Sequence, residues 1–195
     1  MTIRKNEIGN LTTEEFGKLF PIVIVPYDNS WTDLFKSESE LITNTLGNDV
    51  ALRIEHFGST AVEGLSAKPT IDILVEIPHL TDELKEMIIS RMKAIGYHFI
   101  WRTDDKNPYM NFVKGYTPEG YSGNQFHIHM GDKSHSLWDR IYFRDYLRRH
   151  KNTAREYETL KLHLASKFRF DREAYTNAKA EFVNRITAIA KNEND

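Results

Sequence analysis

The chain has 195 residues, a formal net charge of -2 and no cysteine. The lack of cysteine excludes disulfides and thiolate metal sites, so any metal would need histidine, carboxylate or carbonyl ligands. Hydrophobic residues make up 40% and charged residues 28%, which is typical of a globular protein. A nearly neutral chain makes nucleic acid an unexpected partner. The N-terminus has no apolar leader and no stretch reaches about 18 apolar residues, so we expect a cytoplasmic protein without membrane association.

The first two thirds of the chain contain both expected helices and expected strands, and helices alone follow. The expected helices are 12–20, 31–46, 81–95, about 134–149, 153–168 and 171–191. The expected strands are 22–25, 51–57, 70–77, 97–102, 109–114 and 124–130, with a loop over 115–123. This order predicts an α+β fold with a mixed sheet flanked by helices and a helical C-terminal third. We expect one domain over 1–195, comprising an N-terminal helical extension (1–20), an α+β core (21–131) and C-terminal helices (132–195).

A glycine-serine pair follows the expected strand 51–57. Gly58 allows a close backbone approach, and the N–H groups at the start of a short helical turn suit a phosphate. Gly58, Ser59 and Thr60 are therefore candidate phosphate-binding residues, and Lys68 in the following loop could neutralise the phosphate charge. The alternative is an ordinary turn.

Asp72 lies inside a strand that otherwise consists largely of Ile, Leu and Val. An unpaired buried carboxylate is costly, so the aspartate calls for a partner or a function. If strands 51–57 and 70–77 are neighbours, Asp72 could hold Mg²⁺ against phosphates at the Gly58 turn. The alternative is an aspartate on an edge strand, or one paired with Lys68 or an arginine.

The string HFGSTAVEGLSAKPTIDI resembles the signature of the GrpB-like family, which belongs to the nucleotidyltransferase superfamily with a DNA polymerase β-like fold. The segments FPIVIVPYDNSW, FHIHM, FRDYLRRH, EYETLK and AYTNAKAEF resemble further family blocks in the same order, so the resemblance covers about residues 14–190. It implies a nucleotidyltransferase-like mixed sheet and nucleotidyl transfer that uses a Gly-Ser turn and acidic metal ligands. Gly58, Ser59 and Asp72 match that pattern.

The family pattern is incomplete after Asp72. Leu74 stands at the position of the superfamily's second carboxylate. Glu76 shares the same strand face but lies about 13 Å of backbone from Asp72, too far for one metal shell. The sequence therefore does not predict a two-metal site with three carboxylates.

A histidine pair could complete a mixed metal site instead. His127 and His129 share one strand face, about 6.7 Å apart. If their strand lies beside 70–77, Asp72, His127 and His129 are candidate catalytic and metal-binding residues. The expected ion is Mg²⁺ or Mn²⁺, with Zn²⁺ a further candidate because imidazoles suit it. Alternatively, the histidines act as a general base or phosphate contact, or are buried structural residues.

Residues 139–155 carry six basic and two acidic side chains. Arg140, Arg144 and Arg148 form a helical stripe, and Arg144 and Arg148 are candidate phosphate-binding residues. The alternative is a solvated face paired with its own aspartates. Lys161 and Lys179 lie in the family-like blocks and could add to the same positive cleft.

The leading functional hypothesis is a metal-dependent nucleotidyltransferase that transfers a nucleotidyl group from a nucleoside triphosphate to an unknown acceptor. The first alternative is a catalytically inactive module on the same fold that binds a nucleotide or phosphorylated metabolite. The second alternative is a hydrolase with an Asp/His metal site. The expected partner is thus a nucleoside triphosphate or a phosphorylated small molecule.

Overall fold

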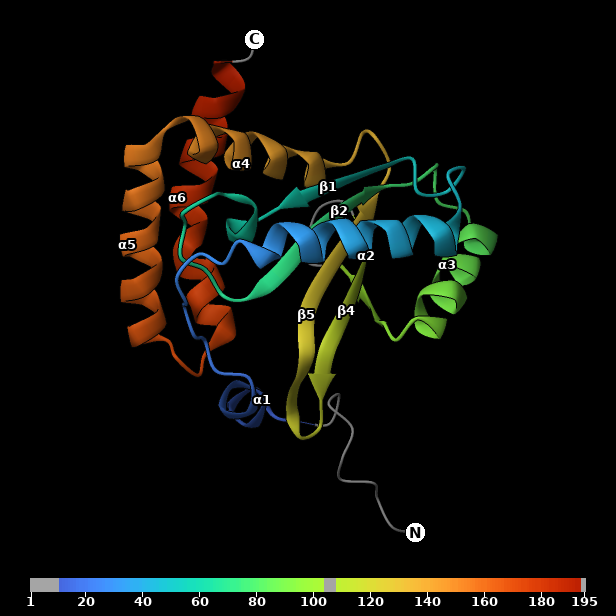
Figure 1. Ribbon diagram of the computed structural model, residues 1–195, viewed down its shortest axis with the longest axis horizontal. Helices are drawn as coiled ribbons and strands as arrows, with labels where there is room; N and C mark the ends of the chain where they lie inside the picture. Colours follow the sequence, from blue (N-terminus) through green and yellow to red (C-terminus); the bar gives the residue numbers. More distant parts are fainter. Residues whose placement is uncertain (1–10, 104–107, 194–195) are drawn as a thin grey trace.

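A five-stranded mixed sheet forms the centre of the computed structural model, which describes residues 11–103 and 108–193 (Figure 1). Its strands are β1 (Arg53–Phe57), β2 (Thr70–Glu76), β3 (His98–Arg102), β4 (Tyr109–Thr117) and β5 (Gly120–Gly131). They lie in the order β1-β2-β5-β4-β3. The β2–β5 pair is parallel and the other pairs are antiparallel, which confirms the predicted mixed sheet.

Along the chain, helices come before the strands, between them and after them. They are α1 (Thr13–Leu19), α2 (Ser30–Leu46), α3 (Asp82–Ala94), α4 (Asp139–Arg149), α5 (Lys151–Lys167) and α6 (Arg172–Asn192), with 3₁₀ turns η2 (Ser59–Ala61) and η3 (Ser136–Trp138). Side-chain caps start several of them: Thr12 caps α1, Thr81 caps α3 and Asp171 caps α6. The predicted helical C-terminal third is confirmed. Within the described residues, no helix combines the length and apolar character needed to cross a membrane.

The main core lies between the sheet and the two helices α2 and α3. Ile71, Ile73 and Val75 of β2 point into it, and α2 crosses in front of the sheet in Figure 1. Because side chains alternate along a strand, Asp72 and Leu74 point to the opposite face. There, Leu74 packs with residues that include Leu137 of η3. The candidate site is therefore on the sheet face away from α2 and α3.

Two local predictions were wrong. Residues 22–25 do not form a strand; Val25 makes an isolated bridge to Ala67. The segment lies between Pro21 and Pro26, and neither proline has an N–H to donate. The predicted loop 115–123 largely belongs to the β4–β5 hairpin. Gly115, at φ 91°, takes up the register shift there, so the strands continue pairing beyond it.

The predicted N-terminal extension is described in part. Its helix is α1, and residues 1–10 lie outside the described residues.

Candidate functional site

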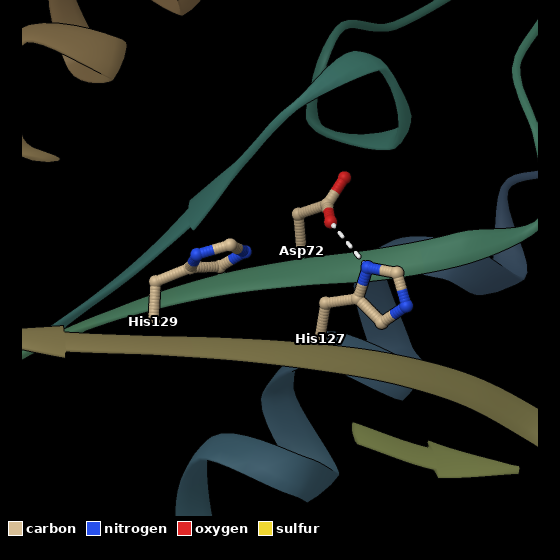
Figure 2. Close-up of side chains that lie close together, drawn as sticks. All are labelled: Asp72, His127 and His129. Atoms are coloured by element: carbon tan, nitrogen blue, oxygen red, sulfur yellow. Dashed lines mark ion pairs between the residues drawn. The ribbon is translucent and has the colours of Figure 1, made fainter. Parts of the chain in front are cut away.

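Asp72, His127 and His129 converge on two neighbouring parallel strands. Asp72 of β2 is the register partner of His127 of β5, and Leu74 is the partner of His129. One potential ligand atom from each of the three side chains lies within 4.8 Å of the others (Figure 2). The adjacency of these strands, which the sequence hypothesis required, is present.

His127 lies between Asp72 and a tyrosine. Its Nδ1 is 3.5 Å from Asp72 Oδ1, and its Nε2 is 2.7 Å from the Tyr116 hydroxyl. Burial lowers the pKa of His127, and the Asp72 carboxylate opposes that shift. A hydroxyl can accept a hydrogen bond as well as donate one. If Tyr116 accepts from Nε2, Nδ1 no longer donates to Asp72, and its lone pair is available to a cation beside that carboxylate.

Asp72 is a charged group within the sheet. Burial acts to raise its pKa, but the hydrogen bond and charge of His127, with the fields of Lys68 and Arg140, outweigh it and leave the pKa below its ordinary value. Because β2 lies between β1 and β5, Asp72 is not on an edge strand. The structure therefore places the positive side chains of Lys68 and Arg140 near a partly buried carboxylate.

The imidazole of His129 contacts the guanidinium of Arg140. Arg140 Nη1 lies 3.0 Å from His129 Nδ1. A guanidinium can only donate, so Nδ1 accepts and the neutral ring carries its hydrogen on Nε2. Burial, followed by the charge of Arg140, lowers the pKa of His129 well below its ordinary value. Figure 2 shows a ring nitrogen of His129 directed toward Asp72.

The glycine-serine turn touches Asp72. Gly58 has a φ of 73°, and a Cβ at this position would collide with the Asp72 carboxylate. The backbone therefore approaches Asp72 as closely as it does because residue 58 is glycine. Ser59 begins the short turn η2. Its side chain also bonds Tyr157 of α5, which opposes the rise that burial causes in the pKa of Tyr157.

Thr60 supports this turn from within the protein. Its side chain is buried and its hydroxyl donates to the Thr70 carbonyl at 3.3 Å. The same hydroxyl lies 3.0 Å from His56 Nε2 and accepts from it, since its own hydrogen is already used. Burial lowers the pKa of His56 to about 4, which leaves that ring neutral. Through these contacts Thr60 joins the turn to β1 and β2.

Three lysines from different parts of the chain lie near one another, and two of them, Lys68 and Lys179, lie near Asp72. Burial lowers the pKa of Lys68 to about 7, of Lys161 to about 7 and of Lys179 to about 8. Positive neighbours lower these values further, and the field of Asp72 raises those of Lys68 and Lys179. Lys68 and Lys179 both contact the ring of Tyr175, at 5.6 and 4.3 Å from its centroid. Lys161 instead donates to the Ser66 carbonyl.

Arg144 and Arg148 connect α4 to the β1 region. Arg144 Nη1 donates to Glu55 Oε2 at 2.7 Å and to the His56 carbonyl at 2.8 Å, while its Nε donates to Asp145. Arg148 donates twice to the Ala61 carbonyl, at 3.0 and 2.8 Å. These bonds join Arg144 to strand β1 and Arg148 to the η2 turn.

The sequence hypothesis missed Tyr116 and Asn111 in this neighbourhood, and it named Arg140 only as part of a helical stripe of arginines. Tyr116 and Arg140 contact the two histidines, and Asn111 of β4 is the register partner of His129. Asn111 is 2% exposed, and within the described part of the chain its Oδ1 has no hydrogen-bond partner. The sequence signal for Asn111 is a polar residue in the middle of the otherwise apolar run YMNFV.

The model of the GrpB protein family matches residues 21–188. The chain belongs to the GrpB family. A UPF0157 protein of Pseudomonas aeruginosa is 42% identical over 170 residues, covering 87% of this chain and 67% of that protein. The glutamate-rich protein GrpB of Alkalihalophilus pseudofirmus is 35% identical over 169 residues, covering 85% of this chain and 93% of that protein.

Solved structures agree with the fold. The crystal structure of GrpB from Enterococcus faecalis matches with a TM-score of 0.76 and 26% identity, covering 88% of this chain and 98% of that chain. The Cid1 poly(U) polymerase bound to Mg 3′-dATP matches with a TM-score of 0.52 and 12% identity, covering 80% of this chain and 49% of that chain. This second likeness concerns the fold alone. The predicted nucleotidyltransferase-like fold of this GrpB-family chain is thereby confirmed.

Proposed function

We propose that the protein is a divalent-metal-dependent nucleotidyltransferase, which moves a nucleotidyl group from a nucleoside triphosphate to an acceptor. The observation that supports this proposal is that three potential metal ligands lie together and that two lysines lie close to one of them, Asp72. Asp72, His127 and His129 offer ligands to a metal, and the neighbouring Lys68 and Lys179 offer positive charge. A metal–nucleotide complex presents the matching charges.

The donor set indicates which ion fits. One carboxylate and two imidazoles suit Mn²⁺ or Zn²⁺ better than Mg²⁺, which prefers oxygen ligands. Metal–ligand bonds of about 2.0–2.2 Å require the three side chains to close modestly from their present spread. A bound ion would supply positive charge to the phosphate oxygens and orient them. For His129 to bind it through Nε2, the ring must lose its present hydrogen bond from Arg140.

In this proposal the protein's side chains bind the phosphates and its glycine turn places the backbone beside Asp72. Lys68 and Lys179 bind the β- and γ-phosphates, and Gly58 lets the turn that begins at Ser59 lie against Asp72. An acceptor oxygen then attacks the α-phosphorus. A new P–O bond forms, the P–O bond to pyrophosphate breaks, and the acceptor's hydroxyl proton passes to solvent water.

One observation favours a second candidate, a nucleotide-binding module without transfer activity. Leu74 occupies the second carboxylate position of the family pattern and is completely buried in an apolar cluster. That leaves Asp72 as the carboxylate of the cluster, which fits one ion rather than a two-metal clamp.

Pyrophosphate release separates these candidates. The purified chain is incubated with each nucleoside triphosphate, Mn²⁺ and a low-molecular-weight cell extract as the source of acceptor. Transfer predicts pyrophosphate release that Asp72→Asn abolishes and that Asp82→Asn, the same change at an exposed side chain of α3, retains. A nucleotide-dependent rise in melting temperature without pyrophosphate would favour the binding module, since saturation at 100 times Kd adds about 2.7 kcal/mol. No shift with any nucleotide would contradict both.

A further inference from the structure

In each histidine of the proposed metal site, one ring nitrogen contacts a neighbouring side chain, and the two neighbours differ in chemistry. The partner of His127 Nε2 is the Tyr116 hydroxyl at 2.7 Å, which can accept an N–H. The partner of His129 Nδ1 is the Arg140 guanidinium at 3.0 Å, which cannot accept. The surroundings of His127 thus suit a metal ligand, whereas the present partner of His129 does not.

Metal binding imposes a requirement on the second nitrogen. A neutral imidazole that binds an ion through one nitrogen carries its hydrogen on the other, and that N–H normally has an acceptor. If His129 binds through Nε2, its hydrogen must be on Nδ1, and Arg140 cannot receive it. A different acceptor is then needed beside His129.

Asn111 offers such an acceptor. It is the register partner of His129 on the antiparallel strand β4, so the two side chains are neighbours on the same sheet face. The side chain is 2% exposed, and its Oδ1 has no hydrogen-bond partner among residues 11–103 and 108–193. Buried side-chain oxygens without a donor are rare in folded proteins, and each calls for an explanation.

We propose that Asn111 is a positioning residue for His129 in the metal-bound protein. When His129 Nε2 binds a Mn²⁺- or Zn²⁺-type ion, its hydrogen is carried on Nδ1 and donated to Asn111 Oδ1. The ring gains no proton and loses none, because one N–H is exchanged for the other through solvent. This inference rests on the metal site of the proposed function, and it accounts for both the unpartnered oxygen and the Arg140 contact.

Arg140 has other partners when it leaves His129. Its Nη2 already lies 3.4 Å from the Tyr109 hydroxyl. Its guanidinium also lies 5.4 Å from the ring centroid of Phe57 and 5.7 Å from that of Tyr109. The arginine can therefore give up the His129 bond while keeping its place beside these rings.

Two substitutions of similar size separate positioning from folding. Asn111→Leu removes the acceptor, and Asn111→Asp keeps an acceptor oxygen. In a calorimetric titration of the full chain with Mn²⁺, Asn111→Leu should bind about 10–100-fold more weakly than wild type, and Asn111→Asp at least as tightly. Without metal, Asn111→Leu should melt no lower than wild type, because it removes an oxygen that has no partner. Arg140→Met should bind Mn²⁺ more tightly, because the competing donor is absent.

Nitrogen-15 spectra of the histidine rings test the tautomer itself. The proposal predicts an Nε2–H form of His129 without metal and an Nδ1–H form with Zn²⁺. Equal Mn²⁺ affinities of wild type and Asn111→Leu, or an unchanged tautomer with Zn²⁺ bound, would overturn this inference and leave the metal site standing. If wild type binds neither ion, the metal site of the proposed function fails first, and the role of Asn111 fails with it.

Discussion

Asp72 and His127 are register partners on the parallel strands β2 and β5, with 3.5 Å between Oδ1 and Nδ1. Both strands are internal to the sheet, so the pair is held by hydrogen-bonded neighbours on each side. A carboxylate and an imidazole fixed in this way need little reorganisation to share a cation. The pair therefore has a rigid backbone frame within the proposed metal site.

Tyr116 should strengthen the binding of Mn²⁺ by Asp72 and His127. Tyr116→Phe removes the hydroxyl at His127 Nε2 and with it the group that orients Nδ1 toward Asp72. We expect Mn²⁺ affinity to fall about 10–100-fold, as measured by calorimetry. The control is Tyr121→Phe, which removes a hydroxyl of the same hairpin that contacts Arg172 instead. Equal affinities of the two variants would argue against an orienting role for Tyr116.

Anion binding should weaken as the pH rises. The pKa is about 7 for Lys68 and about 8 for Lys179, so both lysines lose most of their positive charge between pH 6 and pH 9. An anion binds the protonated form, so affinity is highest below pH 7 and falls through this range. Thermal-shift titrations with sulfate, whose own charge is constant there, measure the effect. The Lys68→Met variant should show a flatter pH profile; a flat profile in wild type would contradict the assignment.

Gly58 should tolerate alanine poorly. Gly58→Ala combines the strain of a φ of 73° with a collision against the Asp72 carboxylate. Gly64→Ala is the matched control, because its φ is 78° and its Cβ would meet open space. Strain alone costs about 1–3 kcal/mol, so Gly58→Ala should lower the free energy of urea unfolding by more than the control and also weaken Mn²⁺ binding. Equal losses in both variants would contradict the close approach.

Arg144 should contribute to stability. Its side chain is 8% exposed and bonds Glu55 and Asp145. Arg144→Met leaves the Glu55 carboxylate without this partner, and breaking such a pair costs up to about 3–5 kcal/mol, less here because Glu55 is partly exposed. Urea unfolding measures the loss, and Arg155→Met on the exposed side of α5 should stay within about 0.5 kcal/mol of wild type. A similar small effect for both would show that the Arg144 contacts are weak.

The sequence predicted which side chains lie together at the Asp72 cluster better than it predicted their surroundings. Alternation along a strand is enough to put His127 and His129 on one face and to set Asp72 apart from its apolar neighbours. Whether β2 and β5 are adjacent depends on pairing between distant segments, so the pattern could state it only as a condition. The GrpB-like resemblance supplied the fold in which this condition holds.

Other features depend on tertiary packing that no local pattern records. The direction of Lys179 is set by how α6 packs, and Arg144 points to Glu55 only because α4 lies on β1. That the Asn111 oxygen lacks a partner among the described residues becomes visible only once those neighbours are placed in three dimensions. Similarly, the glycines and proline of 115–123 predict a loop, because a glycine in a sequence fits a turn and a bulge inside a hairpin equally well, and only the structure shows which one Gly115 forms.

Pulsed electron paramagnetic resonance of Mn²⁺ tests the central claim most directly, because it detects the nuclei bound to the ion. With the wild-type chain, Mn²⁺ and a nucleoside triphosphate, the account predicts nitrogen-14 couplings from the His127 and His129 rings together with phosphorus-31 couplings from the nucleotide. Asp72→Asn should lose the nitrogen couplings or strongly reduce them. Phosphorus couplings without any nitrogen coupling in the wild-type protein would contradict a metal–nucleotide site at this cluster.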